Sequence, residues 1–300
     1  MREQFIFKGE KPEDSGEIVE SLHEIQKEGE KPIKGELDKT ESENRFVIKC
    51  KDYLNEELTD LGVEEKSDIS PEAVHFLPSK VFKKLNPDNL SASVSLGENS
   101  IQIDKQEMRG RLDLYKTVTH EMVHTAAFRK KQIQTEGSVV KVDTLRGGYL
   151  TRNPESPDHE HFRGLGEAIV EKTTMDILKK HAGEIVADFN ISPEEQRQPV
   201  DWQHDNMEVL NAIIRKTAEA SGEDESAEWG KFKKGQFTGE MMHLRDIEKV
   251  FGKGSLRVLA AMGPDAGDGA NKKFLKYFET DDKKERDKLS AEILGKTKKK

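Results

Sequence analysis

Hydrophobic residues recur at helical spacing through much of the chain. The segment Leu112–Phe128 contains no proline or glycine, and its apolar residues cover much of the circumference of a helix. We therefore expect a buried helix there. The same spacing predicts a helix over Phe46–Leu61 that ends at Gly62. Past residue 190 it predicts five more helices, over residues 207–218, 239–251, 255–262, 272–278 and 281–294.

Strand-like alternation marks three further segments. Residues 90–96 alternate apolar and polar side chains, and after the turn formers at 97–99 the alternation resumes at Ile101 and Ile103, which predicts a β-hairpin. The run 73–78 predicts a strand, followed by a short helix over 80–85. The valine-rich stretch before Arg146-Gly147-Gly148 predicts another hairpin. Helices and strands together predict an α+β protein.

Composition divides the chain into three expected parts. Only 33% of the residues are hydrophobic and the mean hydropathy is −0.81, so part of the chain should lie outside any core. We expect residues 1–44, which are rich in charge, to be disordered, with a transient amphipathic helix around Ile18–Ile25 that could also dock on a partner or on the chain's own cleft. Residues 45–190 are expected to form the main domain and residues 191–300 a helical subdomain.

Charge and hydropathy argue against nucleic acid and membranes as partners. The net charge of −9 argues against nucleic acid, because phosphate binding needs a basic surface. There is no apolar run near 18 residues and no hydrophobic signal core, which argues against a membrane. Together with the single cysteine, Cys50, this predicts a cytoplasmic protein, and export without a cleaved signal stays open.

The first group of candidate functional residues lies in the predicted helix at 112–128, which contains His120-Glu121-Met122-Val123-His124. Residues i and i+4 lie one above the other on a helix, so His120 and His124 can offer two imidazole nitrogens to one metal ion. Glu121 lies about 100° around the helix, where it can accept a proton from an activated water. The alternative is a pair of core histidines satisfied by hydrogen bonds. Burying three polar side chains on one helix is costly, which favours the metal.

A third ligand is expected from the segment 162–174. Glu167 and Glu171 lie four residues apart among Leu165, Ala168, Ile169 and Val170, so they share one face of a predicted buried helix. One carboxylate can bind the metal, and Glu171 can hold the N–H of a ligating imidazole. A solvent-facing pair of glutamates is the alternative.

The two motifs together resemble those of the gluzincin metallopeptidases, the thermolysin-like enzymes that bind zinc with two histidines and one glutamate. The resemblance implies a zincin-like core, with a small mixed sheet, an active-site helix and a ligand helix. It makes His120, His124 and Glu167 the ligands of Zn²⁺, Glu121 the general base and Glu171 the supporting carboxylate. One departure is Gly166, where many family members have asparagine.

The group that stabilises an oxyanion is expected between the two motifs. Tyr149 and His161 are the candidates, and for each the alternative is an ordinary strand or loop residue. His75 is expected to be a sheet residue and not a fourth ligand.

The resulting hypothesis is a zinc metallopeptidase acting on a peptide or protein substrate. Two alternatives stay open, namely a non-catalytic metal-binding or interaction protein with a zincin fold, and a metal-dependent amidase of non-peptide substrates.

Overall fold

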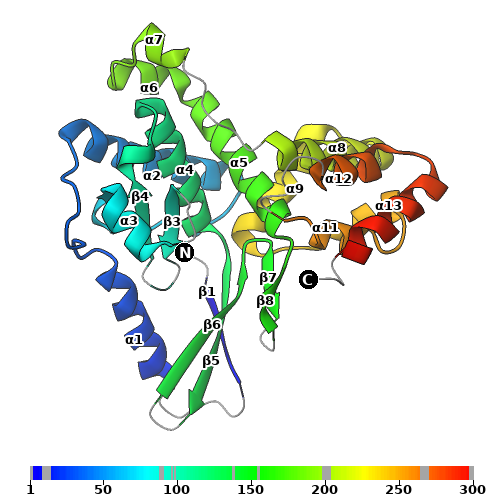
Figure 1. Cartoon of the computed structure of the whole chain (residues 1–300), viewed down its shortest axis with the longest axis horizontal. Helices are drawn as coiled ribbons and strands as arrows, with labels where there is room; N and C mark the ends of the chain where they lie inside the picture. The colour runs from blue at the N-terminus through cyan, green and yellow to red at the C-terminus, as the bar shows by residue number, and fades with distance from the viewer. Residues whose placement is uncertain are drawn as a thin grey trace. The chain divides into compact units, whose positions relative to one another are not determined.

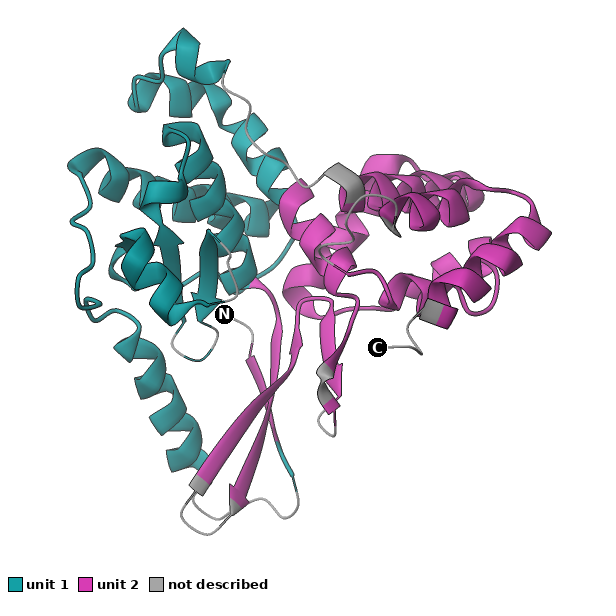
Figure 2. Cartoon of the chain, viewed as in Figure 1, with its two compact units in different colours: residues 1, 7–126, 173–201 teal, residues 2–6, 127–172, 202–300 magenta. Residues whose placement is uncertain are grey.

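The computed structural model describes residues 3–8, 15–87, 91–95, 97, 99–136, 139–153, 156–197, 204–263 and 270–296. Within this part the protein is α+β, with thirteen α-helices and two sheets of five and three strands (Figure 1). The chain forms two compact units (Figure 2). Unit 1 contains residues 1, 7–126 and 173–201, and unit 2 contains residues 2–6, 127–172 and 202–300. The expected domain limits and the expected disorder of residues 1–44 stay predictions.

Unit 1 is built around the three-stranded sheet, in the order β2-β4-β3. Strands β2 and β4 are parallel, and β3 and β4 form the predicted antiparallel hairpin. Of that hairpin prediction, residues 90, 96 and 98 lie outside the described residues. The strands are β2 (Val74–Leu77), β3 (Ala92–Ser95) and β4 (Ser100–Asp104). The helices are α1 (Ser15–Glu28), α2 (Glu41–Asp60), α3 (Ser79–Leu85), α4 (Arg111–Ala126), α6 (Ala182–Asp188), α7 (Pro193–Gln196) and the second half of α5 (Arg163–Lys180).

Helix α2 holds one side of α4. It begins at a capping box in which Thr40 and Glu43 satisfy each other's backbone N–H groups. Phe46 then stacks on Tyr115 of α4, with ring centroids 3.7 Å apart. One helical turn further, the thiol of Cys50 donates to the hydroxyl of Thr119 over 3.3 Å. These buried contacts hold Tyr115 and Thr119, the residues of α4 that come just before His120, against α2.

Unit 2 combines the five-stranded sheet with the C-terminal helices. The strand order is β1-β5-β6-β7-β8. Its strands are β1 (Glu3–Phe7), β5 (Arg129–Glu136), β6 (Val139–Gly147), β7 (Leu150–Asn153) and β8 (Ser156–His161). Its helices are the first half of α5, α8 (His204–Ser221), α9 (Glu225–Thr238), α10 (Leu244–Phe251), α11 (Ser255–Ala260), α12 (Ala270–Glu279) and α13 (Lys283–Lys296). A helix is present in each of the five segments predicted beyond residue 190, although α10 begins at Leu244 and not at residue 239. Helix α9 was not predicted.

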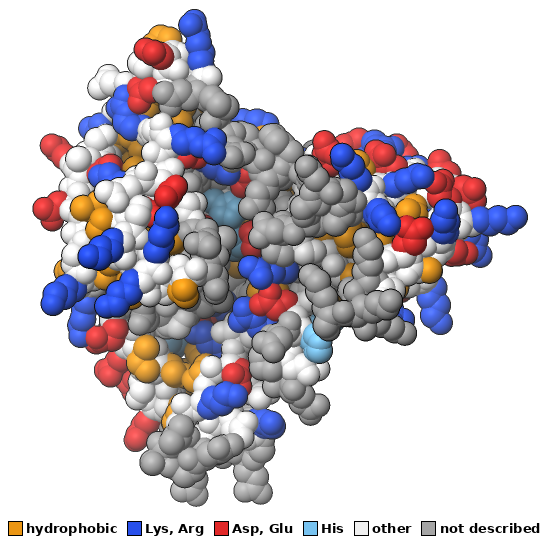
Figure 3. All heavy atoms as spheres, viewed as in Figure 1, with side chains coloured by type: hydrophobic (Ala, Val, Ile, Leu, Met, Phe, Trp, Pro, Cys, Tyr) orange, Lys and Arg blue, Asp and Glu red, His pale blue; other side chains and the backbone are white. Residues whose placement is uncertain are grey.

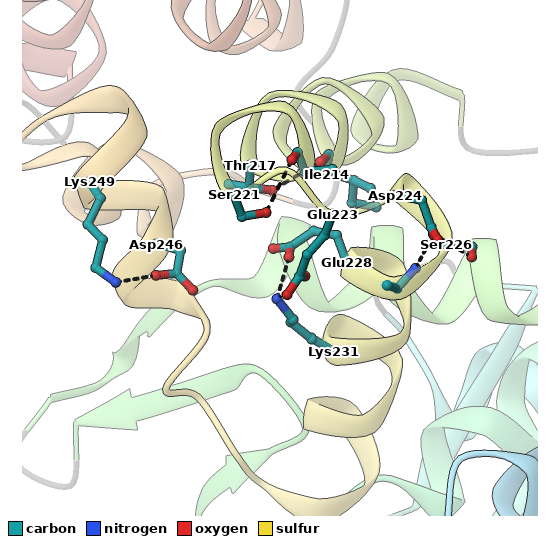
Figure 4. A network of polar contacts seen from close by, with 12 residues as sticks. Ile214, Thr217, Ser221, Glu223, Asp224, Ser226, Glu228, Lys231, Asp246 and Lys249 are labelled. Carbon is teal, nitrogen blue, oxygen red and sulfur yellow. Dashed lines mark hydrogen bonds and ion pairs between the residues drawn. The ribbon is translucent and has the colours of Figure 1, made fainter.

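The turn from α8 to α9 carries the polar network of Figure 4. Asp224 is the N-cap of α9, and its carboxylate accepts from the backbone N–H of Ala227 over 2.8 Å. The ammonium of Lys231 pairs with Glu223 and, at 2.9 Å, with the buried carboxylate of Glu228. Because a buried carboxylate is costly without a partner, this ion pair supports the first turns of α9.

The described surface matches the composition. Acidic and basic side chains are interspersed on the face shown in Figure 3, as expected of a chain in which 36% of the residues are charged. Among the described residues, no helix is long and apolar enough to span a bilayer.

Candidate metal centre

Helix α4 brings the two histidines together as the spacing predicts. Nε2 of His120 and Nε2 of His124 lie 3.2 Å apart, and both side chains are half-buried. Two imidazole nitrogens bound tetrahedrally, each about 2.0–2.1 Å from a zinc ion, are about 3.3–3.4 Å apart. Two lone pairs at this distance repel each other unless a proton or a cation lies between them. The separation therefore suits two nitrogens that share one metal ion, and it also suits a hydrogen bond between the two rings.

Helix α5 supplies the third donor. One ligand atom each from His120, His124 and Glu167 lie within 4.8 Å of one another, and this is a group that could hold a metal ion. The donor set fits Zn²⁺, since two imidazoles and a carboxylate leave a fourth position open, as in catalytic zinc sites. The predicted convergence of these three side chains is confirmed. The identity of the metal stays a prediction.

The two other glutamates lie on the same helices. Glu121 is half-buried on α4, and Glu171 on α5 is fully buried. A fully buried carboxylate so close in sequence to a ligand agrees with the supporting role expected for Glu171, although that role and the role of Glu121 as base stay predictions.

Gly164 lets α5 pack closely against residues 262 and 263, whereas the space around Gly166 is less restricted. Gly164 donates its N–H to the carbonyl of Met262 over 2.8 Å, and a Cβ there would meet the backbone oxygen of Gly263 at 2.5 Å. A Cβ at Gly166 would lie 3.8 Å from the backbone nitrogen of Leu150 and 4.0 Å from Cβ of Tyr149. A side chain as long as asparagine would have to fit against these two residues. These distances are ordinary van der Waals contacts, so the close packing of α5 does not by itself explain the glycine at position 166.

Tyr149 lies in that turn, between β6 and β7, which form the predicted hairpin. Gly148 adopts φ +56°, a conformation that favours glycine. The phenol of Tyr149 is fully buried, and its hydroxyl donates to the carbonyl of Phe232 over 3.1 Å. Burial raises the pKa of Tyr149 well above its ordinary value, so the group stays a neutral phenol. Its role as oxyanion donor stays a prediction.

His243 is a residue that the sequence did not single out. Its Nε2 lies 2.7 Å from the hydroxyl of Tyr149. Because that hydroxyl donates to Phe232, the Nε2–H tautomer of His243 supplies the other hydrogen. Burial, helped by the charge of nearby Lys231, lowers the pKa of His243 to about 4, so the imidazole is neutral near pH 7. No local motif marks His243, because its partner lies far away in the sequence.

The other two histidines of interest lie elsewhere. His161 is at the end of β8, paired with Thr151, and is exposed. Its proposed part in catalysis stays a prediction. His75 is buried in β2, as expected of a sheet residue, with Nδ1 2.8 Å from Glu36 and Nε2 2.7 Å from the carbonyl of Gly29.

Comparison of the chain with protein-family models, with curated proteins and with solved structures found no match.

Proposed function

We propose that this protein is a zinc-dependent peptidase with a zincin-like catalytic core. The observation that carries the proposal is the convergence of His120, His124 and Glu167 within 4.8 Å. Three protein donors, two of them from one helix and one from a second helix, are typical of catalytic zinc sites, in which water occupies the fourth position. The two motifs, His120–His124 and Gly164–Glu171, resemble those of the gluzincins and support the same proposal.

In this proposal His120, His124 and Glu167 hold the ion. When bound, Zn²⁺ supplies a Lewis acid that polarises a carbonyl and lowers the pKa of water to about 7. Glu121, on the same helix as both histidines, accepts the proton of the attacking water and delivers it to the leaving amine. Glu171 holds a ligating imidazole in the required tautomer.

The substrate class follows from this chemistry. A half-buried group of two imidazoles and a carboxylate suits attack on an uncharged carbonyl, and an amide in a polypeptide is the substrate that the resemblance implies. We therefore propose peptide or protein substrates.

The decisive experiment separates metal binding from turnover. Glu121→Gln keeps the shape of the side chain and removes the base, so we expect zinc content equal to wild type and loss of peptide cleavage by a factor of at least about 100. Glu208→Gln makes the same change at an exposed position of α8 and should alter neither quantity. Metal analysis and cleavage of a peptide library measure both.

Three other outcomes would count against the proposal. Zinc loss in the Glu121→Gln variant would make this residue a ligand and not a base. Undiminished cleavage in that variant would remove the proposed mechanism. A wild-type protein that holds zinc and cleaves no peptide would instead be a non-catalytic metal-binding protein.

A further inference from the structure

Strand β1 is the outermost strand of the five-stranded sheet, next to β5 (Figure 1). It is five residues long and lies close to the start of the chain. Residues 2–6 group with unit 2, whereas the chain from residue 7 to 126 groups with unit 1. The strand is thus a short segment that belongs to one unit and is tethered to the other.

The contacts of β1 with β5 centre on one carboxylate. Oε1 of Glu3 lies 2.9 Å from the ammonium of Lys131 and 3.6 Å from the guanidinium of Arg129. All three side chains are almost completely buried, with Arg129 at 0% and Lys131 at 5% exposure. Charged groups this well buried are costly unless they are paired, so the contacts with Glu3 help to compensate the burial of both basic residues.

A second contact extends the pattern along the strand. Residues two apart on a strand point to the same face, which places Arg129 and Lys131 on one face of β5, and Glu3 and Phe5 on one face of β1. The ammonium of Lys131 lies 5.8 Å from the ring centroid of Phe5. The β5 edge is therefore complementary to an extended segment with a carboxylate followed two residues later by an aromatic ring.

We propose that the β5 edge is a binding site for an extended peptide with a carboxylate followed two residues later by an aromatic ring, and that residues 3–7 occupy it as a tethered ligand. Pairing with backbone groups supplies affinity, and the buried basic pair supplies specificity for a carboxylate. The tether raises the effective concentration of β1, so a free peptide competes poorly until the strand is weakened. A short edge strand is also among the elements that open locally at low cost. This site stands apart from the proposed metal chemistry.

The test uses the full-length chain and a fluorescent peptide with the sequence of residues 1–8. Glu3→Lys in the chain reverses the charge that faces Arg129 and Lys131 and should release the tethered strand. The peptide should then bind at least about tenfold more tightly than it binds the wild-type chain, as measured by fluorescence anisotropy. Gln4→Lys, at the neighbouring exposed position, is the matched control and should leave peptide affinity at the wild-type level. A peptide that carries Glu3→Lys itself should not bind either chain.

Equal affinity of the two chains for the peptide, or equal binding of the native and charge-reversed peptides, overturns the proposal. If circular dichroism shows that the Glu3→Lys chain is unfolded, Glu3→Gln replaces it, because this variant removes the charge without reversing it. The same two results would then overturn the proposal. Dimerisation of the wild-type chain that Glu3→Lys abolishes would assign the edge to the strand of a second copy, and would overturn the assignment to the chain's own strand.

Discussion

The hydroxyl of Tyr149 lies 2.7 Å from Nε2 of His243 and bridges that imidazole to the backbone carbonyl of Phe232. The bridge joins three segments of unit 2, namely the β6–β7 turn, helix α9 and the residue before α10. Next to it, Cβ of Tyr149 faces Gly166, the residue before the proposed ligand Glu167. The phenol therefore links the packing of the helical region to the part of α5 that presents Glu167.

Removing this hydroxyl should destabilise the protein. Tyr149→Phe leaves a buried imidazole N–H and a carbonyl without their partner, and we expect a loss of about 1–3 kcal/mol in the free energy of unfolding. Tyr277→Phe makes the same change in another buried ring and should cost less than about 0.5 kcal/mol. Urea unfolding measures both. A Tyr149→Phe protein of wild-type stability with reduced turnover would instead support the oxyanion role.

The lowered pKa of His243 predicts a dependence of stability on pH. Its pKa is about 4 in the folded protein against 6.5 in the unfolded chain, because burial disfavours the charged form. The folded state then binds fewer protons, so the contribution of His243 is fully present above pH 6.5 and is lost as the pH falls towards 4. The total loss is on the order of 3 kcal/mol.

Unfolding at pH 7 and pH 5 tests this prediction. His243→Gln cannot titrate and can still donate to Tyr149, so the difference in stability between the two pH values should shrink relative to wild type. His159→Gln removes an exposed histidine and should leave the difference unchanged. An identical difference in wild type and His243→Gln would show that this imidazole titrates normally.

Glu167 should be needed for metal binding. Glu167→Ala removes one of three donors, so we expect metal affinity to fall at least about 100-fold, with the fold retained. Glu208→Ala, on the exposed face of α8, controls for the loss of a carboxylate. Isothermal titration with Zn²⁺ and circular dichroism provide the two measurements. Affinity that stays within a factor of about two would remove Glu167 from the ligand set.

The candidate metal-binding group could be predicted because its residues lie in two short sequence motifs, each with helical spacing. The distance between His120 and His124 is fixed by the pitch of one helix, and Glu167 stands in a second pattern of the same kind. The helices of the C-terminal region were predictable for the same reason, since their apolar stripes repeat within each segment.

The features that were missed depend on partners distant in the sequence. Strand β5 buries Arg129 and Lys131, so charged residues stand where a strand normally has apolar ones. Both pair with Glu3, more than 120 residues earlier in the sequence. Helix α9 contains Gly230 and Gly235, which oppose helix formation, and it is held by buried contacts of Trp229 and Phe232. Contacts with distant segments stabilise both β5 and α9, and the sequence of each segment alone does not show these contacts.

The close packing of α5 at Gly164 predicts a sensitive position. A Cβ there would lie 2.5 Å from the backbone oxygen of Gly263 and 2.8 Å from that of Met262, so Gly164→Ala must displace backbone. We expect a loss of about 1–3 kcal/mol in unfolding free energy. Gly230→Ala is the matched control, because a Cβ in this helical position meets nothing within 4 Å and should stabilise α9 by up to about 1 kcal/mol. Opposite signs in thermal unfolding would support the close approach of α5, and equal effects would contradict it.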